Sequence, residues 1–256
     1  EALWDDISAY GTFRVIRPDT LEATKYKTVL KFFYTADGFY ISMDMEQPIE
    51  SLVKRFTSRD DWETSSDKVG LSIDTSGESK YGYWFSKSLG DSEADGVLMP
   101  EKIFTTDWDG AWYGSTAETD NGWSAEFFIP WSQMAMPKKT GDRIIKLFTF
   151  RDVAHLEEEW GWPALPDSIP QYMSLFQSTK MNGVNLRQQW SIFPYTSATY
   201  DQIDNNPSYR TGADLFWRPS PNAQITATIN PDFGAVESDN VIVNLSAHET
   251  FLPEKR

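Results

Sequence analysis

The sequence contains no cysteine, and only two of its 256 residues are histidine. The absence of cysteine excludes disulfide bonds, thiolate metal sites and cysteine nucleophiles. It says little about the cellular compartment, because exported bacterial proteins can also lack cysteine. No apolar run approaches the roughly 18 residues of a transmembrane helix. Motifs for a phosphate-binding glycine loop, a nucleophile elbow or a paired-histidine zinc site are also missing.

Basic residues are scarce relative to acidic ones. The chain has 23 Lys and Arg against 38 Asp and Glu, a formal net charge of −15. A charge of this sign repels nucleic acid and anionic lipid surfaces. We therefore expect no nucleic-acid partner.

Aromatic residues are abundant, at 15% of the chain, with Trp 11, Tyr 11 and Phe 16. Large rings suit β-sandwich cores, carbohydrate-facing surfaces and interfaces, where an apolar face and a polar edge are both useful. The length allows one large domain, or one medium domain with an appendage.

The stretch Asp107–Pro137 holds four of the eleven tryptophans. Its polar turn, Thr119–Gly122, contains the Asn-Gly pair that favours a tight hairpin. After the turn, large apolar residues alternate with more polar ones, and Pro130 then removes a ladder donor. The alternation predicts a strand packed on a β core, with these residues facing inward: Trp123, Ala125, Phe127 and Ile129.

Similar short strands are predicted along the first 180 residues. They cover 28–33, 38–45, 68–75, 80–86 and 143–151, with a short helix at 49–56 and loops at 58–67, 90–96 and 154–170. Short strands separated by turn residues at intervals near ten favour an antiparallel β-sandwich. The predicted fold class is therefore all-β, an antiparallel β-sandwich with jelly-roll or immunoglobulin-like layers, over residues 1–180.

Residues 181–256 form a second predicted domain, a β-rich extension containing a β-hairpin. A strand is predicted at Leu186–Pro194, a hairpin at Ala213–Trp217 and Gln224–Ile229, and a further strand over Val241–Ala247. Period-two alternation of this kind is typical of transmembrane barrel strands. It fits extra strands that complete a soluble sheet equally well.

Three motifs carry a resemblance to known families. Gly122–Glu126 followed by Ile129–Trp131 resembles the closing strand of family 9 carbohydrate-binding modules and their DOMON-like relatives. Residues 59–61 and 67–74 resemble the earlier loop and strand of the same modules. The tail, Ile229–Asp239 through Phe251–Arg256, is similar to a junction in bacterial outer-membrane proteins whose function is not characterised.

The resemblance implies an N-terminal fragment of a longer protein, in which a periplasmic module precedes a C-terminal β-barrel. The expected location is the bacterial cell envelope, on the periplasmic face of the outer membrane. The expected partners are a glycan or another polyhydroxylated ligand and the protein's own outer-membrane barrel.

Exposed tryptophans beside acidic residues are candidates for a ligand site. The axial C–H face of a sugar stacks on an indole ring, while carboxylates and amides bind its hydroxyls. Two stretches, 107–113 and 157–162, combine these residue types, and a further tryptophan lies in the aromatic run 81–84. The candidate ligand-binding residues are Trp84, Asp107, Trp108, Asp109, Trp112, Trp160 and Trp162. The alternative is that these rings are core or brace loops.

No cofactor is predicted, and calcium is the alternative that the acidic loops leave open. Asp60, Asp61 and Asp67 lie in one acidic loop, and hard cations bind six to eight oxygens from such loops. The alternative is that this loop is only a solvated acidic face, as is common in a strongly acidic chain.

The sequence thus favours a non-catalytic module that recognises a glycan by stacking it on exposed tryptophan. The alternative is a structural or interaction domain that gates or assembles the barrel, or docks a secretion partner. A glycoside-active enzyme is the third hypothesis, because two carboxylates facing each other across a cleft are invisible in a sequence.

Overall fold

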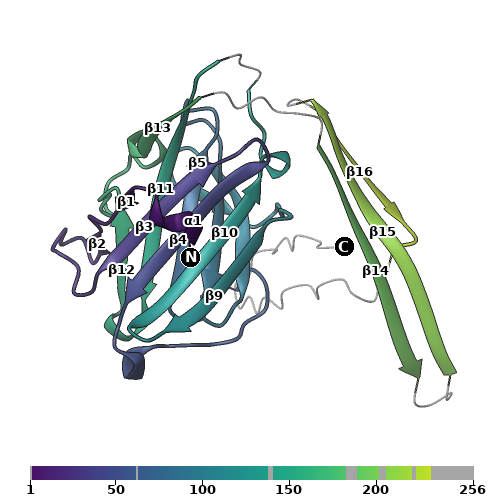
Figure 1. Ribbon diagram of the computed structural model, residues 1–256, viewed down its shortest axis with the longest axis horizontal. Helices are drawn as coiled ribbons and strands as arrows, with labels where there is room; N and C mark the ends of the chain where they lie inside the picture. The colour runs from purple at the N-terminus through teal and green to yellow at the C-terminus, as the bar shows by residue number, and fades with distance from the viewer. Residues whose placement is uncertain are drawn as a thin grey trace, which may run out of the picture. The chain divides into compact units, whose positions relative to one another are not determined.

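The computed structural model describes residues 2–61, 63–137, 141–182, 189–201, 206–220 and 223–231. The chain divides into two compact units, residues 1–186 and 187–256, called unit 1 and unit 2 below. Figure 1 shows both, and each is described by itself. The division falls after residue 186, where the sequence predicted it after residue 180.

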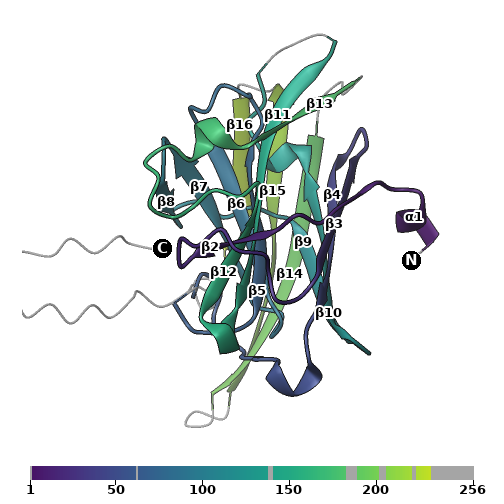
Figure 2. The ribbon, with the colours of Figure 1, turned by 90° about the vertical axis from the view of Figure 1, so that its left-hand side faces the viewer.

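Unit 1 contains two antiparallel sheets, seen edge-on in Figure 2. The first sheet has the strand order β1-β3-β4-β10-β9. Its long central strands pair from Gly122 opposite Glu46 to Pro130 opposite Gly38. The elements of this sheet are β1 (Ala9–Tyr10), β3 (Thr28–Tyr34), β4 (Gly38–Glu46), β9 (Tyr113–Thr119) and β10 (Gly122–Pro130), preceded by the short helix α1 (Ala2–Asp5).

The second sheet has eight strands, in the order β2-β12-β11-β5-β6-β7-β8, with β13 also paired to β11. Its strands are β2 (Arg14–Arg17), β5 (Lys68–Asp74), β6 (Gly82–Ser88), β7 (Glu93–Met99), β8 (Ile103–Thr105), β11 (Arg143–Val153), β12 (Glu158–Trp162) and β13 (Gln177–Met181). Single 3-10 turns occur at η1 (Ile49–Ser51), η2 (Trp131–Gln133), η3 (Ala154–Leu156) and η4 (Met173–Leu175).

The main core lies between the inner faces of these two sheets. The alternation predicted for β10 is confirmed, since its four inward residues and Trp131 are buried. They pack with inward residues of the second sheet, among them Leu71, Phe85 and Leu147. Burying one such side chain contributes about 1.5–3 kcal/mol, so this core supplies most of the force that holds the sheets together. The antiparallel β-sandwich is thereby confirmed.

A buried arginine bridges the two sheets. Arg151 of β11 is fully buried and donates hydrogen bonds to the Thr28 hydroxyl at 2.8 Å and the Gln47 side-chain oxygen at 2.9 Å. It also donates to the main-chain oxygens of Lys27 and Glu46, and its guanidinium lies 4.8 Å from the ring centre of Trp160. Burial lowers the pKa of Arg151 to about 10, an effect that Asp67 opposes.

A second, smaller core covers part of the outer face of the eight-stranded sheet. Its buried members include Trp84, Phe148, Tyr172 and Phe176. The last two belong to the segment that runs from β12 to β13, which folds back over the sheet. This segment shields one part of the outer face from solvent, and a cavity lies beside the shielded part.

Three predicted elements differ from the structure. Residues 90–96, predicted as a loop, contain the start of β7, and the predicted loop 154–170 contains β12. Both strands carry acidic residues whose partners come from distant elements, so their local pattern resembles a solvated turn. The helix predicted at 49–56 is reduced to the 3-10 turn η1.

Unit 2 contains a three-stranded antiparallel sheet of β14 (Gln189–Asp201), β15 (Asn206–Ser220) and β16 (Ala223–Ile229). The predicted hairpin at 213–229 corresponds to β15 and β16, while the strand predicted at Val241–Ala247 lies outside the described residues. Within the described part of the chain, none of the helices has the length and apolar character needed to cross a membrane.

Candidate ligand-binding site

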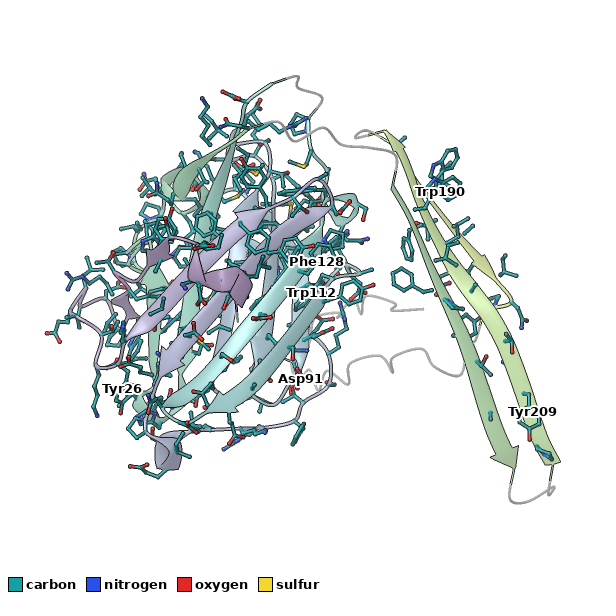
Figure 3. All side chains as sticks on the ribbon, viewed as in Figure 1. Tyr26, Asp91, Trp112, Phe128, Trp190 and Tyr209 are labelled. Carbon is teal, nitrogen blue, oxygen red and sulfur yellow. The ribbon has the colours of Figure 1, made fainter. Side chains whose placement is uncertain are left out.

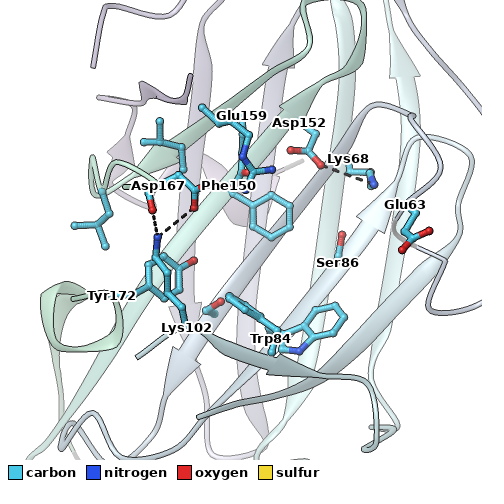
Figure 4. A pocket seen from close by; sticks show the side chains of 15 residues that line it. Glu63, Lys68, Trp84, Ser86, Lys102, Phe150, Asp152, Glu159, Asp167 and Tyr172 are labelled. Carbon is cyan, nitrogen blue, oxygen red and sulfur yellow. Dashed lines mark hydrogen bonds and ion pairs between the residues drawn. The ribbon is translucent and has the colours of Figure 1, made fainter. Parts of the chain in front are cut away.

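A cavity of about 410 Å³ opens on the outer face of the eight-stranded sheet. This volume falls in the range of roughly 300–1,000 Å³ that is usual for small-molecule sites. Figure 4 shows aromatic rings on its floor and charged side chains along its edge. The cavity is lined by Ile16, Arg17, Glu63, Lys68, Ser72, Trp84, Ser86, Lys102, Phe104, Phe150, Asp152, Glu159, Leu165, Asp167 and Tyr172.

Glycines let the aromatic rings lie flat on this face. A Cβ atom at Gly70 of β5 would lie 2.4 Å from the ring of Phe150, so the ring occupies the space that a side chain would fill. A Cβ at Gly96 of β7 would likewise lie 2.7 Å from the indole nitrogen of Trp84. Phe150 is half-buried, whereas Trp84 is only 1% exposed. Phe150 therefore offers the accessible ring, and Trp84 supports the floor.

A row of four charges crosses the sheet along one edge of the cavity. Arg17 pairs in register with Glu159, Glu159 with Asp152, and Asp152 with Lys68. The Arg17 guanidinium lies 3.1 Å from the Glu159 carboxylate, and the Lys68 ammonium 3.9 Å from that of Asp152. The charges in the row thus alternate as plus, minus, minus, plus.

The two central carboxylates have unusual proton affinities. Burial raises the pKa of Asp152, which the neighbouring Lys68 opposes. Burial and the charge of Asp152 together raise the pKa of Glu159, against the effect of Arg17. Both acids therefore bind a proton more readily than an exposed carboxyl group does.

A bulge in β2 helps to build the edge of the site. The register shifts between the partners of Glu159 and Trp160, so the adjacent residues Ile16 and Arg17 both line the cavity. In a regular strand, neighbouring side chains point to opposite faces, and a bulge is the usual way to re-aim one of them.

A second part of the wall comes from the segments that follow β7 and β12. Lys102 lies 3.1 Å from a carboxylate oxygen of Asp167, which also pairs with Arg17 at 3.4 Å. The Tyr172 ring lies beneath this group, with the Lys102 ammonium 5.4 Å from its centre. The cavity thus combines three cations and four carboxylates with an apolar floor.

The predicted stacking site at residues 107–113 is only partly exposed. Trp112 is 5% exposed, stacks on Phe127 and donates its indole N–H to Asp95 at 2.5 Å. Trp108 is half-buried, with its ring 4.8 Å from that of Tyr83. Of the two exposed acids, Asp107 accepts a hydrogen bond from Thr105, and Asp109 pairs with Arg59.

The other predicted tryptophans also pack inside the molecule. Trp160 is fully buried and donates its N–H to Glu158 at 2.7 Å. Trp162 is half-buried beside Tyr10. The expectation of exposed stacking faces therefore fails for Trp84, Trp112 and Trp160, because the sandwich core needs these rings. Among the predicted ligand residues, Trp84 alone lines the cavity.

The structure does not bring together the three predicted metal ligands. Asp67 is fully buried, and its carboxylate accepts hydrogen bonds from Gln47, from the main chain of Val53 and from the main chain of Ala154. Asp61 accepts from the main chain and the hydroxyl of Thr64. Asp61 and Asp67 thus stabilise loops through hydrogen bonds. The prediction that they bind a metal together with Asp60 is corrected.

Asp60 instead lies close to two acids from other segments. Among the described residues, carboxylate oxygens of Asp60, Asp95 and Asp109 lie within 4.8 Å of one another. The Arg59 guanidinium contacts both Asp95 and Asp109 and already supplies positive charge there. A calcium ion at this group would compete with Arg59. Calcium binding stays a prediction.

Most of the cavity residues, including Phe150, Asp152 and Glu159, were not among the ligand residues predicted from the sequence. One signal was available in β11, where Phe148, Phe150 and Asp152 alternate with the core residues Leu147, Thr149 and Arg151. Large residues on both faces of a strand indicate that both faces are covered.

Comparisons with known proteins agree with the geometry of unit 1. The structure is similar to that of a family 9 carbohydrate-binding module from Caldicellulosiruptor kristjanssonii in complex with glucose, with TM-score 0.50, 12% identity, and coverage of 72% of this chain and 88% of that one. It is also similar to a Bacteroides uniformis ATCC 8492 protein for which carbohydrate binding has been suggested, with TM-score 0.51, 13% identity, and coverage of 67% and 85%. Unit 1 therefore has the fold of a family 9 carbohydrate-binding module, as the resemblance predicted.

The sequence comparisons concern a different part of the chain. Residues 187–256 match a domain of unknown function, DUF5916. The sequence matches no curated protein.

Proposed function

We propose that unit 1 is a non-catalytic module that binds a glycan or a similar polyhydroxylated ligand in the outer-face cavity. The observation that carries the proposal is the combination in one cavity of the accessible Phe150 ring with the charged row from Arg17 to Lys68. The C–H face of a sugar ring would lie on Phe150, and its hydroxyls would bind the charged groups. The similarity to a module in complex with glucose supports this choice of ligand.

The arrangement of the acids favours binding over hydrolysis. Asp152 and Glu159 are neighbours on adjacent strands of one wall, and each is paired with a cation. Glycoside hydrolysis needs two carboxylates that flank the scissile bond. The similarity to a module named for binding also supports a non-catalytic role.

A titration of the full chain with glucose and cellotriose tests this function. Phe150→Ala should weaken cellotriose binding by about tenfold, the upper end of what an aromatic contact contributes. Trp108→Ala is the matched control from the other predicted site and should leave the affinity unchanged. The proposal would be overturned if neither sugar bound at millimolar concentration. It would also be overturned if Trp108→Ala weakened cellotriose binding more than Phe150→Ala did.

For unit 2, we propose that one face of its three-stranded sheet lies against lipid. Strand register places Trp190, Ile192 and Pro194 of β14 beside Trp217, Leu215 and Ala213 of β15. The opposite face carries the polar residues Ser197 and Arg210 and, nearer Trp190, the aromatic pair Phe193 and Phe216. Trp190 and Ile192 are 57% and 63% exposed, so the apolar face is open in this structure.

The ends of the apolar face are aromatic. Trp190 stacks on Trp217 at one end, and Tyr209 lies toward the other, as Figure 3 shows. The nine residues from Trp190 to Ala198, the partner of Tyr209, match the 9–11 residues of a membrane-spanning strand. Aromatic girdles around an apolar band are typical of outer-membrane strands. This supports the proposed place of unit 1 on the periplasmic side, next to a barrel of the same protein.

Flotation with phosphatidylcholine vesicles tests the lipid contact. The full chain should float with the vesicles, and Ile192→Glu should abolish flotation by placing a charge on the apolar face. Ser197→Glu places the same charge on the opposite face of the same strand and should still float. Equal behaviour of the two variants would contradict the proposal and favour a protein partner for this face.

A further inference from the structure

Two like charges face each other at the edge of the cavity. Asp152 and Glu159 are register partners on adjacent antiparallel strands, and their side chains point to the same face. Like charges in this position are destabilising, since the Cβ atoms of such partners lie only about 4.5–5.5 Å apart. The two cations at the ends of the row offset part of this repulsion.

The cations of the row lie outside the pair. Arg17 contacts Glu159 from the β2 side, and Lys68 contacts Asp152 from the β5 side. The remaining charged groups that line the cavity are Glu63, Lys102 and Asp167, of which Lys102 and Asp167 pair with each other. Arg17 forms an ion pair with Glu159 and also attracts Asp152 electrostatically.

The pair also stands at the junction of two depressions. Asp152, Glu159, Arg17 and Lys68 line the main cavity and an adjoining one of about 340 Å³. The adjoining depression adds Glu157 and Glu158, so its lining is more acidic than that of the main cavity. A ligand that spans both would pass directly over Asp152 and Glu159.

We propose that a primary ammonium group of the ligand binds between Asp152 and Glu159, so that the preferred glycan is an amino sugar with a free amine. This inference rests on the proposed function of unit 1. An ammonium group has three donors and can satisfy both carboxylates at once, whereas a neutral hydroxyl leaves their repulsion in place. A uronic acid would add a third negative charge and is disfavoured.

A metal ion fits the pair less well. Hard cations bind six to eight oxygens, and the only group of three close acidic side chains among the described residues is Asp60, Asp95 and Asp109. Burial raises the pKa of both Asp152 and Glu159, as expected for acids that lack full compensation by positive charge.

The experiment compares three trimers that differ at carbon 2 of each sugar. The full chain is titrated at pH 7 with a β-1,4-linked glucosamine trimer, its N-acetylated form and cellotriose. The glucosamine trimer should bind at least tenfold more tightly than the other two. Asp152→Asn and Glu159→Gln should each weaken binding of the glucosamine trimer more than binding of cellotriose, so that the preference is lost. Glu118→Gln, an exposed acid paired with Lys54, is the control and should change nothing.

The outcomes separate the two proposals. Binding of cellotriose without any preference for the amine would overturn the inference and leave the proposed function intact. A preference that survives both Asp152→Asn and Glu159→Gln would overturn the inference as well. Failure of all three trimers to bind would overturn both proposals. Thermal melting checks that each variant is folded. If one variant is not folded, the affinities of the native chain for the three trimers decide whether the amine is preferred.

Discussion

At the scale of single residues, the most unusual acid of unit 1 is Asp95. It is fully buried, pairs with Arg59 and accepts the indole N–H of Trp112, and its second carboxylate oxygen has no hydrogen bond. Burial raises the pKa of Asp95 from 3.8 to about 7, although Arg59 and Trp112 act in the opposite direction. Between about pH 4 and pH 7, Asp95 therefore binds a proton more readily in the folded state than in the unfolded chain.

This pKa predicts a pH dependence of stability. A carboxyl group with a raised pKa in the folded state stabilises the fold below its unfolded pKa, and this contribution is lost as the pH rises through about 7. The native chain should therefore lose stability between pH 4 and pH 8, whereas Asp95→Asn should not. Relative to the native chain, the free energy of unfolding of Asp95→Asn should rise over this range by at least about 1 kcal/mol. Urea unfolding at several pH values measures the difference. A difference that stays constant over this range would show that Asp95 is ionised throughout.

A substitution at Arg151 tests how strongly this residue couples the two sheets. Arg151→Met would leave the acceptors on Thr28 and Gln47 without their buried donor. Removing one partner from a buried charged network costs about 3–5 kcal/mol. Denaturant unfolding should show this loss, while Lys54→Met, in an exposed ion pair, should cost less than about 1 kcal/mol. Similar losses for both variants would mean that Arg151 does not couple the sheets.

At the scale of strands, the floor of the cavity depends on the absence of a side chain at Gly70. Gly70→Ala would place a Cβ 2.4 Å from the Phe150 ring and 2.5 Å from the main-chain oxygen of Phe85. We expect a loss of about 1–3 kcal/mol in stability together with weaker cellotriose binding, because the ring must move. Gly82→Ala is the control on the neighbouring strand, where one of the two nearest contacts is the flexible end of Met173. Unfolding and titration of both variants check this, and unchanged binding in Gly70→Ala would contradict it.

The strands also show which parts of the fold could be predicted from the sequence. Period-two alternation correctly predicted β4, β5, β10 and β11, because in each of them one face is buried in the main core. It failed for β7 and β12, whose acidic residues look solvated but are paired with Arg59 and Arg17. Such pairs join residues far apart in the chain, and local pattern carries no information about them.

The candidate site was harder to predict than the fold. Tryptophan was expected to mark the ligand site, yet Trp112 and Trp160 are core residues that use their N–H groups to hold buried or half-buried acids. The accessible ring belongs to Phe150, and its position depends on Gly70 and on the strand register. Composition could point to an aromatic and acidic site, but only the register shows which rings and acids meet.

At the scale of the whole molecule, the two units have different surfaces. Unit 1 covers part of its outer sheet with loops and keeps a polar cavity, whereas unit 2 exposes an apolar face on a three-stranded sheet. A binding module joined to lipid-facing strands would hold its ligand close to a membrane. The net charge of −15 would also favour cationic ligands over anionic ones.

The most direct test is a crystal structure of the full chain soaked with cellotriose. A sugar ring should lie on Phe150, with its hydroxyls within hydrogen-bonding distance of the row formed by Arg17, Glu159, Asp152 and Lys68. A sugar bound instead at Trp108 and Asp109, with the outer-face cavity empty, would contradict the assignment of the site.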